Sequence, residues 1–137
     1  MLRPEATPEA FHRRQAGTLP DRYGLSILSV EQGLLRSQLA IEPWMLAPNG
    51  YLHAASVILL ADTTAGYATI AHLPDGAKGF TTIELKTNFL GTALEGTLLC
   101  NCTAEHLGRT TQVWSATVSD GKGRRLALFR CTQLILR

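Results

Sequence analysis

The chain has 137 residues, 45% of them hydrophobic, and a formal net charge of +2 at pH 7. A chain of this length and composition can form one hydrophobic core but not two, so we expect a single domain over residues 1–137. Because the basic residues are scattered along the chain, the charge pattern excludes the footprint of a nucleic-acid-binding protein and leaves a weak preference for small anionic ligands.

The cysteines and the first residues indicate the cellular compartment of the protein. Cys100, Cys102 and Cys131 form neither an even set for disulfides nor the spacing of a metal site, so we expect reduced thiols and no metal. The first residues contain no apolar leader, and the apolar run over 54–61 is far too short to span a bilayer. We therefore expect a cytoplasmic protein without a membrane segment.

The first third of the chain predicts a short helix and a hairpin. Thr7-Pro8-Glu9 is a helix-start pattern and Gly17 a plausible end, which makes residues 1–20 an N-terminal helical extension that finishes in a connector at 19–21. Residues 24–31 and 34–42 then read as two short strands joined by a turn at Gln32-Gly33.

The middle of the chain predicts a loop followed by one long helix. Residues 44–52 contain Pro48, Asn49 and Gly50, which are typical turn residues. Residues 52–73 are rich in Ala and Leu, lack proline and exceed the usual length of a strand, so they predict a buried helix that Pro74-Asp75-Gly76 ends.

The remainder of the chain predicts an antiparallel sheet. Apolar and polar residues alternate over 82–89, and strand-length segments follow at 97–106, 110–119 and 126–136, separated by glycine-containing turns. One long helix with five or six such strands is an α+β arrangement. Because the helix is apolar nearly all round, we expect a curved sheet to wrap it and a partner subunit to supply further cover.

Asp62 is the clearest indication of chemistry in this chain. It lies in the most apolar stretch, with no cation within eight residues on either side. Removing an ionised carboxylate from water without a partner costs several kcal/mol or raises its pKa, so such a position needs a reason. A buried acid that only bonds nearby backbone is the alternative explanation.

The loop and helix start from Pro48 to Ala55, with Asp62 nine residues after His53, resemble the signature of hotdog-fold acyl-CoA thioesterases of the phenylacetate-degradation type. Residues 107–111 and 120–123 resemble the closing hairpin of the same family. The resemblance implies a curved antiparallel sheet around one long helix, assembly into homodimers or dimer-of-dimers tetramers, and hydrolysis of acyl-CoA thioesters. It implies no cofactor, since coenzyme A is part of the substrate.

The resemblance also implies roles for individual residues. Asp62 matches the catalytic acid, acting as general base or nucleophile, and Ala54 matches the residue whose backbone N–H polarises the thioester carbonyl. His53 lines the site, although a histidine at a helix start more often serves as a cap. Thr82 matches a hydroxyl that positions the attacking water, although by default it is an ordinary strand residue. The substrate-binding positions are Asn49, Gly50, Gly66, Thr82 and Phe80.

Helix geometry places this chemistry between two subunits. The first N–H groups of a helix lack intrahelical acceptors and suit an oxyanion, which fits Ala54. Ala54 and Asp62 are eight residues apart, about 12 Å along a helix at about 1.5 Å per residue, too far to address one carbonyl. We therefore expect two antiparallel helices, in which Asp62 of one subunit approaches the helix start of the other.

Three departures from the family pattern bear on rate and substrate. Ala54-Ala55 stands where relatives usually carry two glycines, Ala47 where they often carry Asn or Gln, and Gly66 where they often carry Ser or Thr. Asn49 is a possible substitute for the missing amide, and Gly66 suggests close packing or space for the acyl group.

The sequence leaves the acyl group and several alternatives open. We expect an aryl or medium-chain acyl-CoA, and no single ligand of the CoA phosphates can be chosen among the basic residues near predicted turns, which are Lys78, Arg109, Lys122, Arg124 and Arg125. The alternatives are a non-catalytic acyl-CoA or lipid-binding protein, a structural oligomerisation module, and, as a weaker rival, a hydratase of the same fold.

Overall fold

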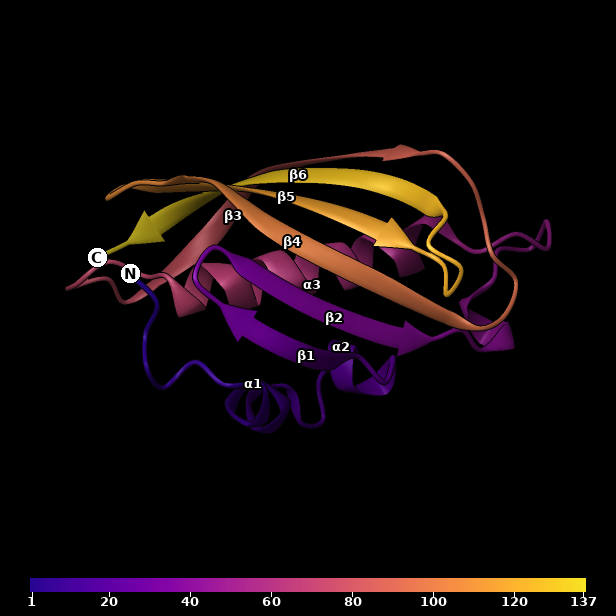
Figure 1. Ribbon diagram of the computed structural model, residues 1–137, viewed down its shortest axis with the longest axis horizontal. Helices are drawn as coiled ribbons and strands as arrows, with labels where there is room; N and C mark the ends of the chain where they lie inside the picture. The colour runs from indigo at the N-terminus through magenta and orange to yellow at the C-terminus, as the bar shows by residue number, and fades with distance from the viewer.

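The computed structural model describes residues 1–137 and consists of a six-stranded antiparallel sheet curved around one long helix (Figure 1). The sheet has the order β1-β2-β4-β5-β6-β3. Its strands are β1 (Ser26–Glu31), β2 (Leu34–Ala40), β3 (Gly79–Phe89), β4 (Thr97–Leu107), β5 (Thr111–Ser119) and β6 (Arg125–Leu136). The α+β class and the curved sheet around one long helix, both predicted from the sequence, are confirmed.

The central helix, α3 (Ala54–Ala71), begins two residues later and ends two residues earlier than predicted. His53 caps its start and His72 caps its end, where the ring of His72 bonds the carbonyl of Ala68 at 2.8 Å. Small and apolar residues such as Leu60, Ala61, Ala65 and Ala68 are fully buried against the sheet. Their size lets the helix approach the sheet closely.

The apolar run over 54–61 is part of a longer apolar helix. Helix α3 has 18 residues and a mean hydropathy of 1.3, which by length and composition alone is enough to cross a membrane. Over half of it, 56%, is buried inside the fold, and the core helix of a globular domain has the same length and composition.

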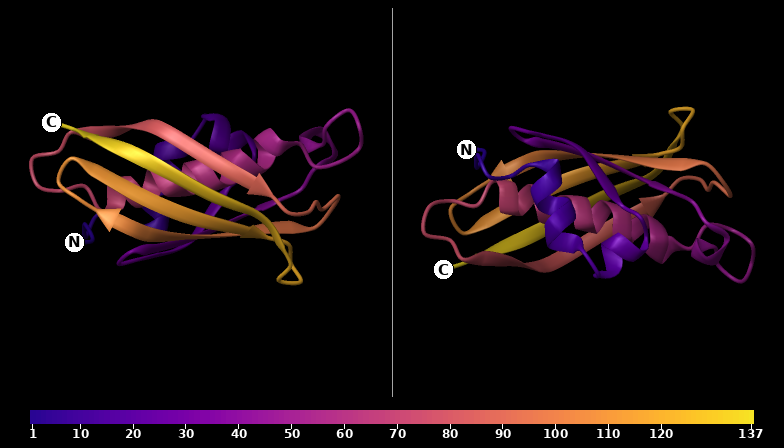
Figure 2. Two further views of the ribbon diagram at one scale, coloured as in Figure 1. Left: turned by 90° about the horizontal axis from the view of Figure 1, so that it is seen from above. Right: turned by 90° about the horizontal axis from the view of Figure 1, so that it is seen from below.

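Two helices, rather than one, precede the sheet. The predicted helix is α1 (Pro8–Gln15), in which the Thr7 hydroxyl accepts the N–H of Ala10 at 3.2 Å. The predicted connector at 19–21 is instead a short helix, α2 (Leu19–Arg22). The sequence contains the reason for this correction, because Thr18, Pro20 and Asp21 repeat the start pattern of α1. Both helices lie beside α3 when the molecule is viewed from below (Figure 2).

The two edges of the sheet differ in their cover. Strand β1 packs against α1, whereas β3 has no element beyond it (Figures 1 and 2). Most of β3 is exposed, including the apolar side chains of Ile83, Leu85 and Phe89. An open edge of this length is a template for pairing with another strand.

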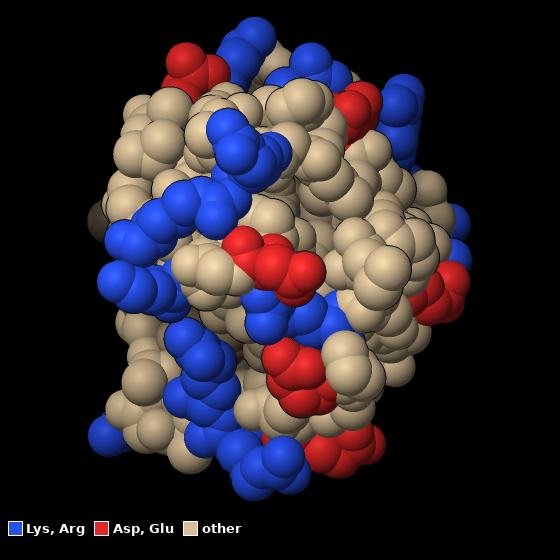
Figure 3. All heavy atoms as spheres, turned by 90° about the vertical axis from the view of Figure 1, so that its left-hand side faces the viewer, with Lys and Arg blue, Asp and Glu red and all other residues tan.

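The two ends of the molecule carry different basic residues. Arg3 and Arg137 donate to the carbonyls of Leu73 and Asp75 at 2.9 and 3.1 Å, near the end of α3 and both chain termini, where Lys and Arg side chains are prominent (Figure 3). The turn between β5 and β6, which contains Arg124, lies at the opposite end beside the start of α3 (Figure 1). The five basic candidates for CoA phosphates are thus split between the two ends.

Candidate active site

Asp62 lies on α3 with one carboxylate oxygen unpaired. The side chain is partly buried, and its Oδ1 is shielded from solvent without any hydrogen-bond partner. Burial raises the pKa of this carboxyl above its ordinary value near 3.8, because desolvation disfavours the charged form. The carboxylate faces the interior of the fold, where its charge helps to raise the pKa of the Cys131 thiol. An unpaired acid of this kind is free to accept a proton or attack a carbonyl.

A cavity of about 230 Å³ lies beside Asp62, between α3, α2 and β3. Four of the residues predicted for the site, Asp62, Gly66, Phe80 and Thr82, line it together. The other lining residues are Pro20, Thr63, Tyr67 and Ile70. The cavity therefore combines one acid with a mostly apolar and aromatic wall.

The contact between Gly66 and Phe80 explains the glycine. A Cβ atom at Gly66 would come within 3.2 Å of Cζ of Phe80, so the ring occupies the space that a side chain would need. The predicted close packing at Gly66 is confirmed. The ring of Phe80 on β3 thus packs against the glycine of α3.

The start of α3 offers one free backbone donor. The N–H of His53 bonds the carbonyl of Met45 at 3.1 Å, that of Ala55 bonds Nδ1 of His53 at 2.9 Å, and that of Ser56 bonds the carbonyl of His53 at 3.0 Å. The N–H of Ala54 donates to no acceptor within the chain, and Ala54 is exposed. It is therefore the donor available to an oxyanion.

His53 is the N-cap of α3. Its backbone is extended and its Nδ1 accepts a helix N–H, which is the behaviour of an N-cap. Because Nδ1 is occupied by the N–H of Ala55, His53 is placed as the cap of α3 beside Ala54 and is not arranged as a general base.

Asn49 and Gly50 form the turn that precedes the helix. Oδ1 of Asn49 accepts the N–H of Tyr51 at 3.2 Å, and Gly50 has a φ of +88°, which favours glycine. The N–H of Ala47 bonds the carbonyl of Tyr51 at 2.7 Å and closes the turn. Neither Asn49 nor Gly50 lines the cavity beside Asp62, so their predicted contact with substrate stays a prediction.

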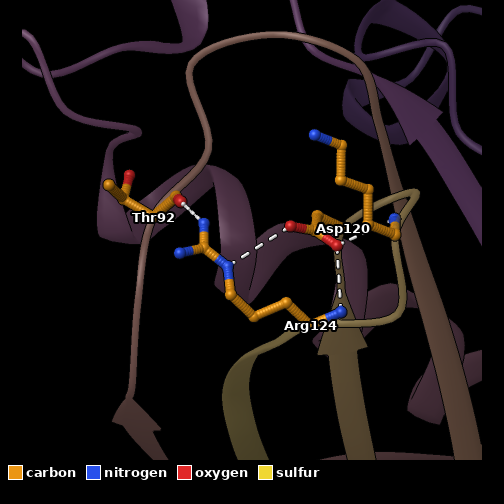
Figure 4. A network of polar contacts seen from close by, with 4 residues as sticks. Thr92, Asp120 and Arg124 are labelled. Carbon is orange, nitrogen blue, oxygen red and sulfur yellow. Dashed lines mark hydrogen bonds and ion pairs between the residues drawn. The ribbon is translucent and has the colours of Figure 1, made fainter.

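A polar network connects this loop to the turn between β5 and β6 (Figure 4). Asp120 accepts the backbone N–H and the Nε of Arg124 at 2.9 and 3.3 Å, and Nη2 of Arg124 donates to the carbonyl of Thr92 at 2.6 Å. The hydroxyl of Thr92 in turn accepts the N–H of Leu52 at 3.2 Å. Residues 120–124 thus hold the segment immediately before the helix start.

A second cavity, of about 350 Å³, opens on the same face of α3. Ala55, Ile58, Leu59, Asp62 and Thr63 line it from the helix, and Leu19 and Tyr23 complete it. Asp62 and Thr63 line both cavities. One partly open face of α3 therefore runs from the helix start past Asp62 to Ile70.

The sequence did not predict two residues of the cavity wall, Pro20 from the N-terminal extension and Tyr67 from α3. Pro20 and Tyr67 line the cavity beside Asp62, and the Tyr67 ring stacks on Phe11 at 4.6 Å, which docks α1 against α3. The hydroxyl of Tyr67 donates to Oε1 of Gln15 at 2.8 Å. The start pattern of α2 was a usable signal for Pro20, whereas nothing in the local sequence marks Tyr67.

The cysteines are free and unsuited to nucleophilic chemistry. All three are buried, and burial raises the pKa of the Cys100 and Cys131 thiols to about 12. The three thiols stay protonated near neutral pH, whereas a cysteine nucleophile has to be a thiolate. The cysteines are therefore not arranged as nucleophiles, and Asp62 is the acid that lines the cavity.

Comparison with known proteins identifies the family of the chain. The sequence model of the thioesterase superfamily matches residues 49–127, more than half of the chain. A 1,4-dihydroxy-2-naphthoyl-CoA hydrolase from Listeria monocytogenes is 30% identical over 114 residues, covering 83% of this chain and 92% of the relative. The proofreading thioesterase EntH from Klebsiella pneumoniae is 28% identical over 132 residues, covering 96% of each.

Solved structures show the same fold. A variant of the thioesterase PA1618 from Pseudomonas aeruginosa superposes with a TM-score of 0.92 at 23% identity, covering 98% of this chain and 97% of the other. The Escherichia coli PaaI protein from the phenylacetic acid degradation operon gives a TM-score of 0.86 at 21% identity, covering 100% and 97%. The chain therefore belongs to the thioesterase superfamily, has its hotdog fold and is a thioester hydrolase.

Proposed function

We propose that this protein hydrolyses an aromatic acyl-CoA to the free acid and CoA, with Asp62 as the reactive carboxylate and the Ala54 N–H as the oxyanion donor. The aromatic class is favoured over a medium aliphatic chain because Phe80 and Tyr67 contribute aromatic rings to the lining of the cavity. The naphthoyl-CoA hydrolase among the relatives acts on a substrate of this class.

The proposed reaction needs one acid and one donor. Asp62 as general base removes a proton from water, the water oxygen bonds to the thioester carbon, and the carbonyl oxygen becomes an oxyanion that accepts the N–H of Ala54. The carbon–sulfur bond then breaks, and the CoA thiolate takes the proton back from Asp62. In the nucleophilic alternative the Asp62 carboxylate attacks the carbon itself, the carbon–sulfur bond breaks with release of the CoA thiolate, and water then hydrolyses the resulting anhydride to the free acid and the Asp62 carboxylate.

The proposed site is completed by a second copy of the chain. Asp62 and Ala54 are separated by about 12 Å along one helix, so a single helix cannot serve one carbonyl with both groups. Two features support a two-fold pairing, which are the partly open face of α3 and the uncovered edge of β3. We propose a homodimer with antiparallel α3 helices and two equivalent sites, which can pair further into a tetramer.

The observation that carries this proposal is an acid with an unpaired oxygen, Asp62, in the wall of a cavity that Phe80 and Tyr67 also line. Replacing Asp62 with Asn should lower kcat by roughly 10²–10⁴ towards aromatic acyl-CoAs, the usual contribution of a positioned acid or base. A panel of benzoyl-CoA, hydroxybenzoyl-CoAs, 1,4-dihydroxy-2-naphthoyl-CoA and octanoyl-CoA, followed with a thiol-reactive dye, measures this. Unchanged hydrolysis by Asp62→Asn across the panel would overturn the assignment.

The melting temperature of Asp62→Asn and the pH dependence of the wild-type rate provide two further checks. Burial raises the pKa of Asp62, so the ionised carboxylate is less stable in the folded protein than in the unfolded chain. The free energy of unfolding therefore falls as the pH rises above 3.8 and Asp62 ionises. Asp62→Asn should therefore melt no lower than the wild type near neutral pH. The rate of the wild type should rise with pH through a midpoint above 3.8, as the carboxyl loses its proton.

A non-catalytic acyl-CoA-binding protein is the second candidate. Ala47 and Gly66 carry no polar side chain at two positions where the resemblance to the family implies an amide and a hydroxyl, and the ring of Phe80 lies against Gly66. Tight binding of an acyl-CoA without thiol release would favour this candidate over the thioesterase.

A further inference from the structure

The two cavities on the open face of α3 have two lining residues in common, Asp62 and Thr63. One cavity extends from them along the helix to Ile70, and the other extends in the opposite direction to Ala55, close to the helix start. Thr63 therefore lies beside the acid at the place where the two cavities meet. A thioester that reacts at Asp62 reacts next to the side chain of Thr63.

The hydroxyl of Thr63 is free, unlike those of the other two threonines of α3. Oγ1 of Thr64 donates to the carbonyl of Leu60 at 2.7 Å. Oγ1 of Thr69 donates in the same way to the carbonyl of Ala65 at 2.8 Å. A bond of this kind to the preceding turn is common for a threonine inside a helix. The hydroxyl of Thr63 makes no such bond and has no other partner in the chain, so it is available to a molecule in either cavity.

The other hydroxyl groups near Asp62 are either already bonded or confined to one cavity. The hydroxyl of Tyr67 donates to a glutamine of α1 at 2.8 Å, and that of Tyr23 lies 3.3 Å from a serine hydroxyl of α3. Thr82 lines the cavity beside β3 but not the second one. Thr63 is thus the residue that presents a free hydroxyl to both cavities.

The proposed hydrolysis needs a water molecule that is oriented as well as deprotonated. A single carboxylate binds one hydrogen of the water and leaves the molecule free to rotate about that bond. A second acceptor beside the carboxylate binds the other hydrogen and leaves a lone pair of the oxygen directed at the carbonyl carbon. A threonine hydroxyl can be this acceptor, because its oxygen has two lone pairs.

We propose that Thr63 is a second catalytic residue, which holds the attacking water together with Asp62. This inference rests on the proposed function. Asp62 removes one proton of the water, the hydroxyl of Thr63 accepts a hydrogen bond from the other, and the water oxygen bonds to the thioester carbon. Thr63 keeps its own proton throughout, and the second hydrogen of the water stays on the acid that is formed. The step therefore needs no further acid or base.

Thr63→Val tests this role, because valine keeps the branched shape of threonine and lacks the hydroxyl. With an acyl-CoA that the wild type hydrolyses, its kcat should fall roughly 3–10-fold, the usual net worth of one hydrogen bond, and its KM should change little. Thr63→Ser keeps a hydroxyl and should regain most of the rate. Both variants should melt close to the wild type, because the hydroxyl at this position has no partner in the chain.

The matched control is Thr69→Val on the same helix. The hydroxyl of Thr69 is bonded inside the helix, and its side chain lines neither cavity. This variant makes the same chemical change outside the site, so its kcat should equal that of the wild type.

A double variant separates this inference from the proposed function. If Thr63 and Asp62 act on one water molecule, adding Thr63→Val to Asp62→Asn should lower kcat little further, because the effects of residues that act as a unit are not additive. Undiminished hydrolysis by Asp62→Asn would refute the proposed function, and this inference with it.

Three results would overturn the role of Thr63 and leave that of Asp62 intact. One is a wild-type kcat in Thr63→Val. Another is an equal loss in Thr63→Ser, which would mean that the shape of the side chain matters and its hydroxyl does not. The third is a loss that adds in full to that of Asp62→Asn, which would mean that the two residues act separately.

Discussion

Ala54 contributes a backbone N–H, which no side chain at that position can supply or remove, except proline. Three of the neighbouring N–H groups, those of His53, Ala55 and Ser56, have acceptors within the chain, and that of Ala54 has none. The free donor also lies at the positive end of the helix dipole, which favours a developing negative charge. A single substitution at Ala54 can therefore remove this one N–H and test its role.

Replacing Ala54 with proline should abolish most turnover while leaving the fold intact. Proline is well tolerated at the first position of a helix, and His53 has the extended backbone, with φ −66° and ψ 134°, that a residue before proline prefers. Loss of one oxyanion donor typically lowers kcat by roughly 10²–10³. Steady-state kinetics and circular dichroism measure the two effects.

The control for this change is Ala54→Val, which adds comparable bulk but retains the N–H. It should keep far more activity than Ala54→Pro. Equal losses in the two variants would show that crowding, and not the missing donor, is responsible.

A site residue could be predicted from the sequence only where neighbouring residues in the chain mark it. The hypothesis for Asp62 and Ala54 could be drawn from the sequence because the isolated acid, the turn residues and the spacing all lie within one segment. The place of Pro20 could not, because it reaches the cavity only when α2 packs beside α3, and the unpaired amide of the buried Gln133 could not, because its burial depends on the packing of distant segments. An orphaned amide in particular is defined by its surroundings, which a glutamine in a strand pattern does not reveal.

At the scale of elements, the turn between β5 and β6 supports the start of α3 through Arg124 and Thr92 (Figure 4). Leu52 lies two residues before Ala54, so the hydroxyl of Thr92 fixes the backbone just ahead of the proposed oxyanion donor. A shift of about 1 Å in such a group can cost a large part of the rate. We interpret Thr92 as a positioning residue that acts through the backbone.

Thr92→Val should therefore lower kcat by about tenfold or less and change KM little, because it removes the hydroxyl acceptor of the Leu52 N–H at constant shape. Thr92→Ser retains the hydroxyl and should restore most of the rate. Kinetics of the three proteins on one acyl-CoA measure this. A kcat for Thr92→Val equal to that of the wild type would contradict the positioning role.

Element boundaries followed from the sequence where caps and turns were explicit. The strand pattern predicted β4, β5 and β6 within one or two residues, since each is flanked by glycine-containing turns. Strand β3 begins at Gly79, three residues before the predicted start, because its pairing with β6 extends it beyond the alternating pattern. Helix α2 was missed because four residues are too few to show a helical period.

At the scale of the whole molecule, the exposed apolar edge of β3 and the partly open face of α3 mark surfaces that a second copy would cover. The sequence predicted such cover from a helix that is apolar nearly all round. It also predicted the need for two helices from the spacing of Ala54 and Asp62 alone. The central claim is that each site takes its acid from one subunit and its oxyanion donor from the other.

Mixed dimers of the two inactive variants test this claim most directly. Asp62→Asn and Ala54→Pro subunits carrying different tags are co-expressed, and dimers that bear both tags are purified. If the site is shared, one site of each mixed dimer keeps both Asp62 and the Ala54 N–H while the other lacks both, so about half of the wild-type turnover per dimer should return. Turnover no higher than that of either variant alone would place both groups of a site in one chain and contradict the account.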